Sequence, residues 1–349
     1  MKRAIFLLFL GFFPAIFGFA QTDLQAVATI SLTKTESISV KQLRTEVERM
    51  EKGTGRPLSQ SERLDLLNVM INERLAVQGA EKDRVTITEN EVNAQIQELR
   101  NSMAQTIGRQ PTDAEFSKAI LDNSGMDLTT FRDSLRRQMI TQKYLMTKKD
   151  SIFKAIKLPT EEEIRSAYTL NKASFVRPET VRFSMIQVPY GADAAARTKA
   201  KALADNLARE IGTSASKFDE VVVRGQTANS GYQAGDGGYM PRTADAQMVV
   251  GQNFLNTAFS LKQGEVSKLM EGVPGTGYQI IKLTESYGMK TLELSDIVQL
   301  GTNMTVRDYI GNAMLQERQQ LALAQATQEL VADLRKASTI RIFENNIKW

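Results

Sequence analysis

Hydrophobic residues recur every three to four positions over most of the chain, and this spacing places them on one face of an α-helix. Residues 61–79 show the pattern most regularly. The apolar positions of that segment are Leu64, Leu67, Ile71 and Leu75. A second helix is predicted from residue 127 to about residue 148. An apolar face of this kind usually belongs to a core, although an open groove for another polypeptide would have the same spacing.

Several helix starts carry a motif in which Ser or Thr is followed three residues later by Glu or Gln. In this capping box, each of the two side chains accepts a hydrogen bond from a backbone N–H at the other end of the first turn. The motif occurs at residues 39–42, 59–62, 88–91, 112–115 and 160–163. Its repetition predicts that helices dominate the N-terminal half.

Alternating hydrophobicity replaces the helical pattern near residue 180, which indicates a change to strands. We expect strands at 181–190, 266–270 and 278–283, and helices at 194–211 and 253–261. Mixed elements in this order predict a compact α+β domain. The glycines at 235, 237 and 238 are expected in a tight turn, because no helix and no lysine follow them as in a phosphate-binding loop.

A helical pattern returns at residues 303–337, and the chain ends with the strand-like segment TIRIF at 339–343. We expect this segment to pair with AVATISL at 26–32, so that both chain ends build one helical module. The fold class is therefore α+β, with an α+β domain inserted into a helical module. The expected parts are residues 1–20, 21–175, 176–288 and 289–349.

The first twenty residues have the pattern of a secretory signal peptide. A basic start is followed by an apolar run at residues 4–17, and small residues stand at Gly18 and Ala20. A membrane anchor is the alternative, but the run is shorter than the span of about 20 residues that a bilayer requires. We expect cleavage after Ala20, a periplasmic location and no stable membrane insertion afterwards.

The amino-acid composition excludes several kinds of catalytic and metal site. The 349 residues include no histidine and no cysteine, which excludes Ser-His-Asp and Cys-His catalysis and zinc sites with nitrogen or sulfur ligands. We expect neither a metal nor a cofactor. The formal charge of +4 falls to +2 when Lys2 and Arg3 are removed, and this balance argues against nucleic acid as a partner.

Several segments together resemble known exported proteins. They include LLNVMINERLAVQGAEKDRVTITENEV at 66–92, AGDGGYM at 234–240, NFLNTAFSLKQGEVS at 253–267 and GTGYQIIKL at 275–283. In this order, they resemble the SurA/PrsA/PpiC group of exported chaperones. The resemblance covers nearly all of residues 25–345. It implies a helical chaperone module that carries an inserted parvulin-type peptidyl-prolyl isomerase domain, with an FKBP-like α+β fold.

The sequence departs from the family where the resemblance places its catalytic groups. The family usually has a histidine on the first and on the last strand of the parvulin domain, and these places hold Met185 and Gln279. The position that is often acidic or Cys is matched by Thr227. Met cannot donate or accept a strong hydrogen bond, and Gln does not titrate. We therefore expect weak or absent isomerase activity.

The apolar substrate positions of the family are better preserved. The resemblance implies a proline pocket that uses Met240 or Met248 together with Phe254 and Phe259, with Tyr278 as a further substrate-binding residue. Core packing alone would also explain the two phenylalanines. The same holds for Met185, because Met readily fills gaps in a core.

Three functions are compatible with these features. The first is a periplasmic holdase that assists exported or outer-membrane proteins by binding unfolded or extended polypeptides, including segments rich in proline and aromatic residues. The chain has 14 methionines, whose flexible side chains suit an adaptable binding surface. The alternatives are an active isomerase, and a scaffold or peptide-binding protein with one stable partner.

Overall fold

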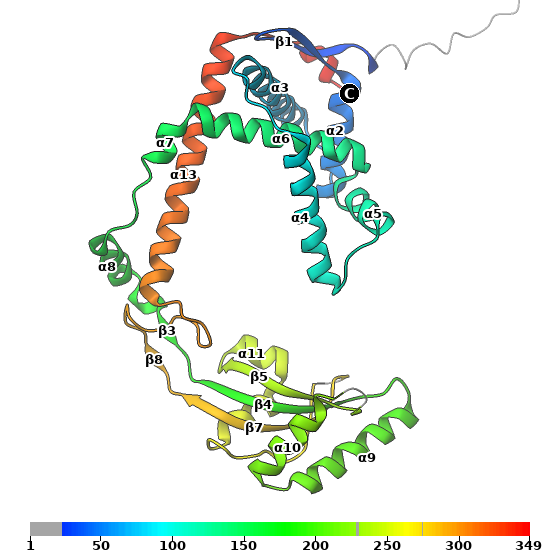
Figure 1. Ribbon diagram of the computed structural model, residues 1–349, viewed down its shortest axis with the longest axis vertical. Helices are drawn as coiled ribbons and strands as arrows, with labels where there is room; N and C mark the ends of the chain where they lie inside the picture. Colours follow the sequence, from blue (N-terminus) through cyan, green and yellow to red (C-terminus); the bar gives the residue numbers. More distant parts are fainter. Residues whose placement is uncertain (1–22, 228–229, 274) are drawn as a thin grey trace, which may run out of the picture. The chain divides into compact units, whose positions relative to one another are not determined.

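The computed structural model describes residues 23–227, 230–273 and 275–349 (Figure 1). The signal peptide predicted for residues 1–20 lies outside this range. The chain divides into two compact units. The first unit consists of the chain up to Ile156 together with Arg318–Trp349, and the second is Lys157–Glu317. The second unit is therefore an insertion into the first, and it extends beyond residues 176–288 at both ends.

The first unit contains a three-stranded sheet and a set of helices (Figure 1). Its strands are β1 (Ala26–Ser31), β2 (Thr35–Ser39) and β9 (Thr339–Ile342). Its helices are α2 (Val40–Thr54), α3 (Gln60–Lys82), α4 (Glu89–Ile107), α5 (Asp113–Ser124), α6 (Leu128–Lys148), α7 (Asp150–Lys154), the later part of α13 (Val306–Ala337), and the 3₁₀ helix η2 (Glu344–Ile347). Within the described residues, no helix is both long and apolar enough to cross a membrane.

The two chain ends meet in this sheet, whose strand order is β2-β1-β9. Strand β9 pairs with β1 in antiparallel fashion and places Ile340 opposite Ile30. The predicted pairing of TIRIF with AVATISL is thus confirmed. Because β9 directly follows α13, the pairing ties the end of that helix to the N-terminal module.

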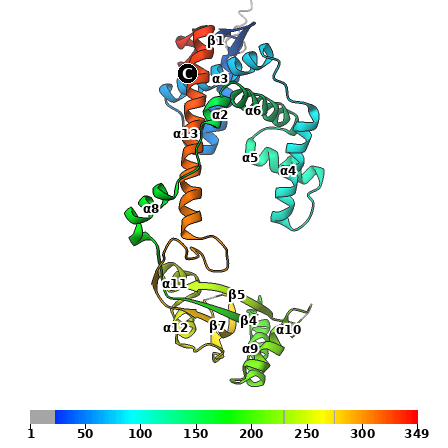
Figure 2. The same cartoon turned by 60° about the vertical axis from the view of Figure 1, so that its left-hand side comes forward.

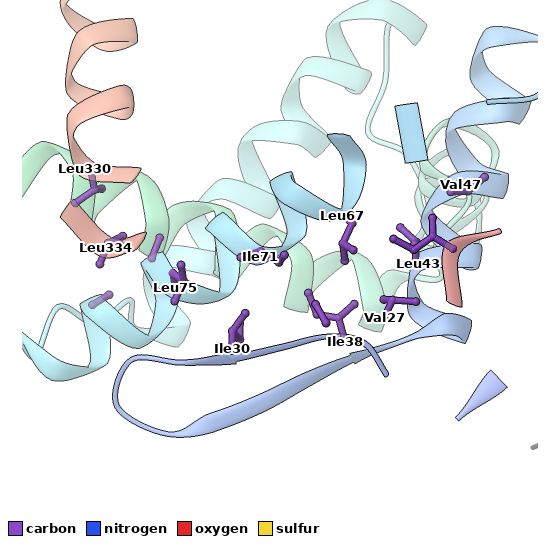
Figure 3. Packing of buried hydrophobic residues seen from close by; sticks show 14 of the residues in the cluster. Val27, Ile30, Ile38, Leu43, Val47, Leu67, Ile71, Leu75, Leu330 and Leu334 are labelled. Carbon is purple, nitrogen blue, oxygen red and sulfur yellow. The ribbon is translucent and has the colours of Figure 1, made fainter. Parts of the chain in front are cut away.

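One apolar cluster holds the first unit together (Figure 3). Leu67, Ile71 and Leu75 of α3 are fully buried between the sheet and the other helices, so the core interpretation of this face is confirmed. Leu330 and Leu334 of α13 belong to the same cluster. The burial of a Leu or Ile side chain contributes about 1.5–3 kcal/mol, so these contacts supply much of the module's stability.

All five predicted capping boxes are present, at the N-termini of α2, α3, α4, α5 and α8. In α3 the backbone N–H of Ser59 donates to the Glu62 carboxylate at 2.7 Å, and the N–H of Glu62 donates to Ser59 Oγ at 3.3 Å. Each cap contributes about 1 kcal/mol, which explains why these helices begin at these residues.

The second unit is built on a four-stranded antiparallel sheet with the order β5-β4-β7-β6. The strands of the unit are β3 (Val176–Arg177), β4 (Thr180–Pro189), β5 (Gln233–Pro241), β6 (Met270–Glu271), β7 (Gly277–Tyr287) and β8 (Lys290–Thr291). Its helices are α8 (Glu161–Leu170), α9 (Ala194–Ile211), α10 (Ala215–Gly225), α11 (Ala244–Val250), α12 (Gln252–Ser260), the first part of α13 and the 3₁₀ helix η1 (Lys172–Ser174).

Helices cover both faces of this sheet (Figure 2). Helices α9 and α10 pack on one face, and α11 and α12 pack on the other. A smaller cluster joins α8 and the start of α13 through Tyr168, Leu292 and Ile310. Together the two units form the α+β architecture that the sequence indicates.

The glycine-rich segment is the clearest difference from the expected elements. Residues 235–238 lie within β5 rather than in a tight turn, so that prediction was wrong. The pairing of β4 with β5 is interrupted by a bulge at Gly237, where a Cβ atom would collide with the ring of Phe183. Glycine is required here because the strand passes against an aromatic ring.

Candidate functional site

The sheet face under α12 brings Met185 and Gln279 together. In the pairing of β4 with β7, Met185 lies opposite Ile281, and Gln187 lies opposite Gln279. Side chains two positions apart on a strand share a face, so all four point to the same side. Met185 and Gln279 are therefore diagonal neighbours, a separation that long side chains can bridge.

Apolar residues form the rest of this face. Phe254 and Met240 are buried, and the ring of Phe254 meets that of Phe183 edge to face, with 5.3 Å between centroids. Phe259 and Met185 are partly buried against the same cluster. Edge-to-face packing stabilises an aromatic pair by about 0.5–1.5 kcal/mol beyond simple burial.

The remaining predicted site residues lie elsewhere. Met248 is 76% exposed on α11. Tyr278 lies on the opposite face of the sheet, against α9, and its ring is 5.1 Å from that of Tyr190. Thr227 is exposed just beyond α10, and its hydroxyl donates to the Arg224 carbonyl at 2.7 Å. The structure thus places Met185, Met240, Phe254, Phe259 and Gln279 on the α12 side of the sheet, and it places Met248, Tyr278 and Thr227 elsewhere.

The side-chain amide of Gln279 has an unused acceptor. Its Oε1 is buried and has no hydrogen-bond partner among the described residues. Gly272 leaves room for this amide, because a Cβ there would stand 3.1 Å from Gln279 Cδ. A buried acceptor without a partner costs about 1–3 kcal/mol, so the amide of Gln279 is held at this position at the expense of stability.

Gln187 belongs to the site and was not singled out from the sequence. Its Nε2 donates to the backbone carbonyl of Thr276 at 3.4 Å, and it faces Gln279 across the two strands. The alternating pattern contained the necessary signal, since Gln187 lies two positions after Met185 on one strand. Met185, Gln187 and Gln279 do not ionise in the physiological range, so these three side chains offer no proton-transfer group.

Ionised groups of the sheet form a separate network around Arg182. This guanidinium donates to Asp236 at 2.6 Å and to Glu285 at 2.9 Å, and its hydrogen bond lowers the pKa of Asp236. The hydroxyl of Tyr287 also donates to Glu285, which lowers the pKa of Glu285 and raises the pKa of Tyr287 to about 12. These shifts keep the ion pairs charged, so the network stabilises the sheet.

In the parts of the chain that the structure describes, the acidic side chains form no group of three or more that could hold a metal ion.

Family models identify both parts of the chain. Residues 1–145 match the SurA-like N-terminal domain, and residues 159–299 match the PPIC-type PPIase domain. The chain thus combines a segment that matches the SurA-like N-terminal domain with a segment that matches the PPIC-type PPIase domain, as the sequence resemblance implied.

Curated relatives agree with this assignment. The Chaperone SurA of Alcanivorax borkumensis is 26% identical over 243 residues, which cover 68% of this chain and 51% of that protein. The Chaperone SurA of Burkholderia lata is 26% identical over 266 residues, which cover 74% of this chain and 55% of the relative. The chain therefore spans about half the length of the curated relatives that it matches.

Solved structures with detectable similarity include one from a study of the SurA-like chaperones PEB4 and Cj1289 of Campylobacter jejuni. It is 14% identical, covers 91% of this chain and 100% of its own, and has a TM-score of 0.38. The foldase protein PrsA of Streptococcus pneumoniae is 16% identical, with a TM-score of 0.30 and coverage of 90% and 94%.

Proposed function

We propose that the chain is a periplasmic chaperone that holds unfolded or extended polypeptides, and that its parvulin-like domain has little or no isomerase activity. The observation that carries this proposal is the diagonal placement of Met185 and Gln279 on one sheet face of a PPIC-type domain. These are the positions where the family resemblance expects two histidines. Met185 has no strong donor or acceptor, so a hydrogen-bonded pair cannot form there.

The chemistry of proline isomerisation supports the same proposal. Rotation about a peptide bond has a barrier of about 18–20 kcal/mol, and a catalyst must bind the twisted amide more tightly than the planar one. Such a catalyst needs an open apolar slot and preorganised dipoles beside the amide. Phe254 and Met240 are both buried, which leaves little of their surface for a proline ring.

A working isomerase is the second candidate. The packed rings of Phe183 and Phe254 favour this candidate, because an apolar surface that excludes water from a bound proline can by itself lower the rotational barrier. The two candidates differ in one measurable quantity, the rate at which the chain turns over a proline peptide.

The holding function is tested by aggregation. A chemically unfolded outer-membrane β-barrel protein is diluted into buffer with residues 21–349 of this chain, and light scattering is followed. We expect scattering to fall as the chain reaches several-fold molar excess, while the same excess of serum albumin has little effect. Unchanged scattering at that excess would overturn the proposal.

The catalytic part is tested with a proline peptide whose cis and trans forms have different absorbance. We expect the wild-type chain to leave the uncatalysed rate unchanged. A rate above that background that is lost in the variant Phe254→Ala, with its fold verified by circular dichroism, would establish the isomerase instead.

A further inference from the structure

Two connected depressions in the second unit meet at Phe175, just after η1. The smaller has a volume of about 340 Å³, and its lining includes Arg177, Tyr239 and Leu300. The larger has a volume of about 700 Å³, and its lining includes Met304, Tyr309, Met314 and Glu317. Ser174, Phe175, Val298 and Gln299 line both depressions, so they form one continuous surface, which we call the Phe175 groove.

Aromatic rings give the groove a defined apolar wall. The Phe175 ring lies 5.7 Å from that of Tyr168, and it meets the ring of Tyr309 edge to face at 6.3 Å. Tyr309 is nevertheless 49% exposed, and Met304 is also exposed. Rigid aromatic groups beside adaptable methionines are characteristic of surfaces that bind varied apolar side chains.

The groove is separate from the family's proline pocket. Met185, Phe254 and Gln279 do not line either depression. Tyr239 does line the groove, and it is adjacent on β5 to Met240, which packs under α12. Neighbouring residues on a strand point to opposite faces, so Tyr239 is directed away from that pocket.

Charge indicates which polypeptide segments fit. Arg177 is the one residue charged at neutral pH among those that line the smaller depression. Its guanidinium lies 5.1 Å from the Tyr287 ring, and its Nε has no hydrogen-bond partner among the described residues. The nearby carboxylate of Asp296 already accepts from Lys290 Nζ at 2.6 Å and from the Glu293 N–H at 2.7 Å. A ligand carboxylate would therefore complement Arg177.

We propose that the Phe175 groove binds an extended polypeptide segment that has apolar or aromatic side chains and a carboxylate beside Arg177. This inference rests on the proposed chaperone function and adds a binding surface outside the proline pocket. A volume of several hundred cubic ångströms accommodates a few side chains of such a segment. The binding does not require proline in the segment.

Methionine methyl groups report on the groove and the proline pocket separately. Residues 21–349 are labelled with ¹³C at the methionine methyls and titrated with the proline-free peptide acetyl-Asp-Phe-Ala-Phe-Ala-amide. We expect the methyl signals of Met304 and Met314 to shift with saturation, while those of Met185 and Met240 stay unchanged. Shifts confined to Met185, Met240 or Met248, or no shift at Met304 and Met314, would overturn the proposal.

Two variants test whether the peptide binds specifically in the Phe175 groove. Tyr309→Ser removes an exposed aromatic wall, and we expect it to weaken peptide binding about tenfold. Leu170→Ser is the matched control, because Leu170 is 83% exposed in the same unit and does not line the groove. Equal weakening by both variants would contradict a specific groove.

The role of Arg177 is tested with a second peptide in which Asn replaces Asp. Arg177→Gln should weaken the Asp peptide about threefold, as expected for a partly exposed ion pair, and leave the Asn peptide unaffected. If Arg177→Gln weakens the binding of both peptides equally, the peptide carboxylate does not contribute to binding at Arg177.

The outcome also separates this proposal from the proposed function. If aggregation is suppressed but the peptide does not shift the methyl signals of Met304 and Met314, only the proposal for the Phe175 groove is wrong. Shifts at Met304 and Met314 without suppressed aggregation support the groove and overturn the holding function.

Discussion

Gln279 is the residue on which the proposed loss of catalysis depends most. Its amide lies on the face that also carries Met185 and Gln187, and its Oε1 is buried without a partner among the described residues. An amide can bind a peptide group but cannot change its charge at neutral pH. The arrangement therefore suits binding better than catalysis through a titrating pair.

Restoring both histidines tests this interpretation. We expect Met185→His combined with Gln279→His to give a catalysed rate above the uncatalysed background for a proline peptide, because a buried hydrogen bond between the two histidines contributes about 1–1.5 kcal/mol. The measurement is the catalysed isomerisation rate of the double variant against the wild-type chain and each single variant.

Gln187→His serves as the matched control, since it places a histidine on the same face but opposite Gln279. We expect no gain from it. A double variant that stays as slow as the wild type would show that the missing pair is not what limits the rate.

At the scale of single elements, local sequence signals predicted the helices well and the details of the strands less well. The capping boxes and the face of Leu67, Ile71 and Leu75 depend on residues close in sequence, which is why they could be recognised. The glycines of β5 were wrongly expected in a turn, because the contact that requires glycine at position 237 is made by the ring of Phe183, which is distant in the chain. The register that pairs Gln187 with Gln279 is likewise set by contacts between distant strands.

Helix caps also make the stability of the first unit depend on pH. The pKa of three capping glutamates is lowered to about 2, and these are Glu62, Glu91 and Glu115. A hydrogen bond from Arg56 is the largest cause for Glu62, and the backbone N–H of Thr88 is the largest cause for Glu91. The unfolded chain, with ordinary glutamate pKa values near 4.5, takes up protons first as the pH falls.

Stability should therefore be complete above about pH 5 and should decline as the pH falls towards 2. A chain with Glu62→Gln, Glu91→Gln and Glu115→Gln keeps capping partners that do not titrate, as Gln42 does naturally in α2. We expect this variant to lose less stability between pH 5 and pH 2 in urea unfolding followed by circular dichroism. A decline as steep as in the wild type would contradict the role of these caps.

Helix α13 provides a test of how the chain ends support the first unit. Leu330 is buried in the core cluster with α3, whereas Leu321 is 64% exposed on the same helix. We expect Leu330→Ala to lower the free energy of unfolding by about 2–5 kcal/mol and Leu321→Ala to change it by less than about 0.5 kcal/mol.

The single tryptophan makes this measurement specific, because Trp349 packs against the same cluster in the first unit. Its fluorescence during urea unfolding reports that unit. Similar midpoints for the two alanine variants would show that α13 does not contribute to the core as described.

At the scale of the whole molecule, the chain combines a helical module closed by both of its ends with an inserted parvulin-like unit. The pattern of elements predicted an α+β domain and the pairing of the two chain ends, and the family resemblance implied that the inserted domain is parvulin-like. The Phe175 groove could not be predicted in the same way, because its lining comes from segments between residues 167 and 317 that meet only in the folded unit. Binding sites made from distant segments need the structure.

The central proposal is that the chain binds unfolded polypeptides without isomerising their proline bonds. One refolding time course tests it most directly. A protein whose slow refolding phase is limited by proline isomerisation, on a scale of about 10–100 s, is refolded at an aggregating concentration with and without residues 21–349. We expect a higher final yield of folded protein and an unchanged rate constant for the slow phase. An accelerated slow phase in proportion to the added chain, with no gain in yield, would contradict the proposal.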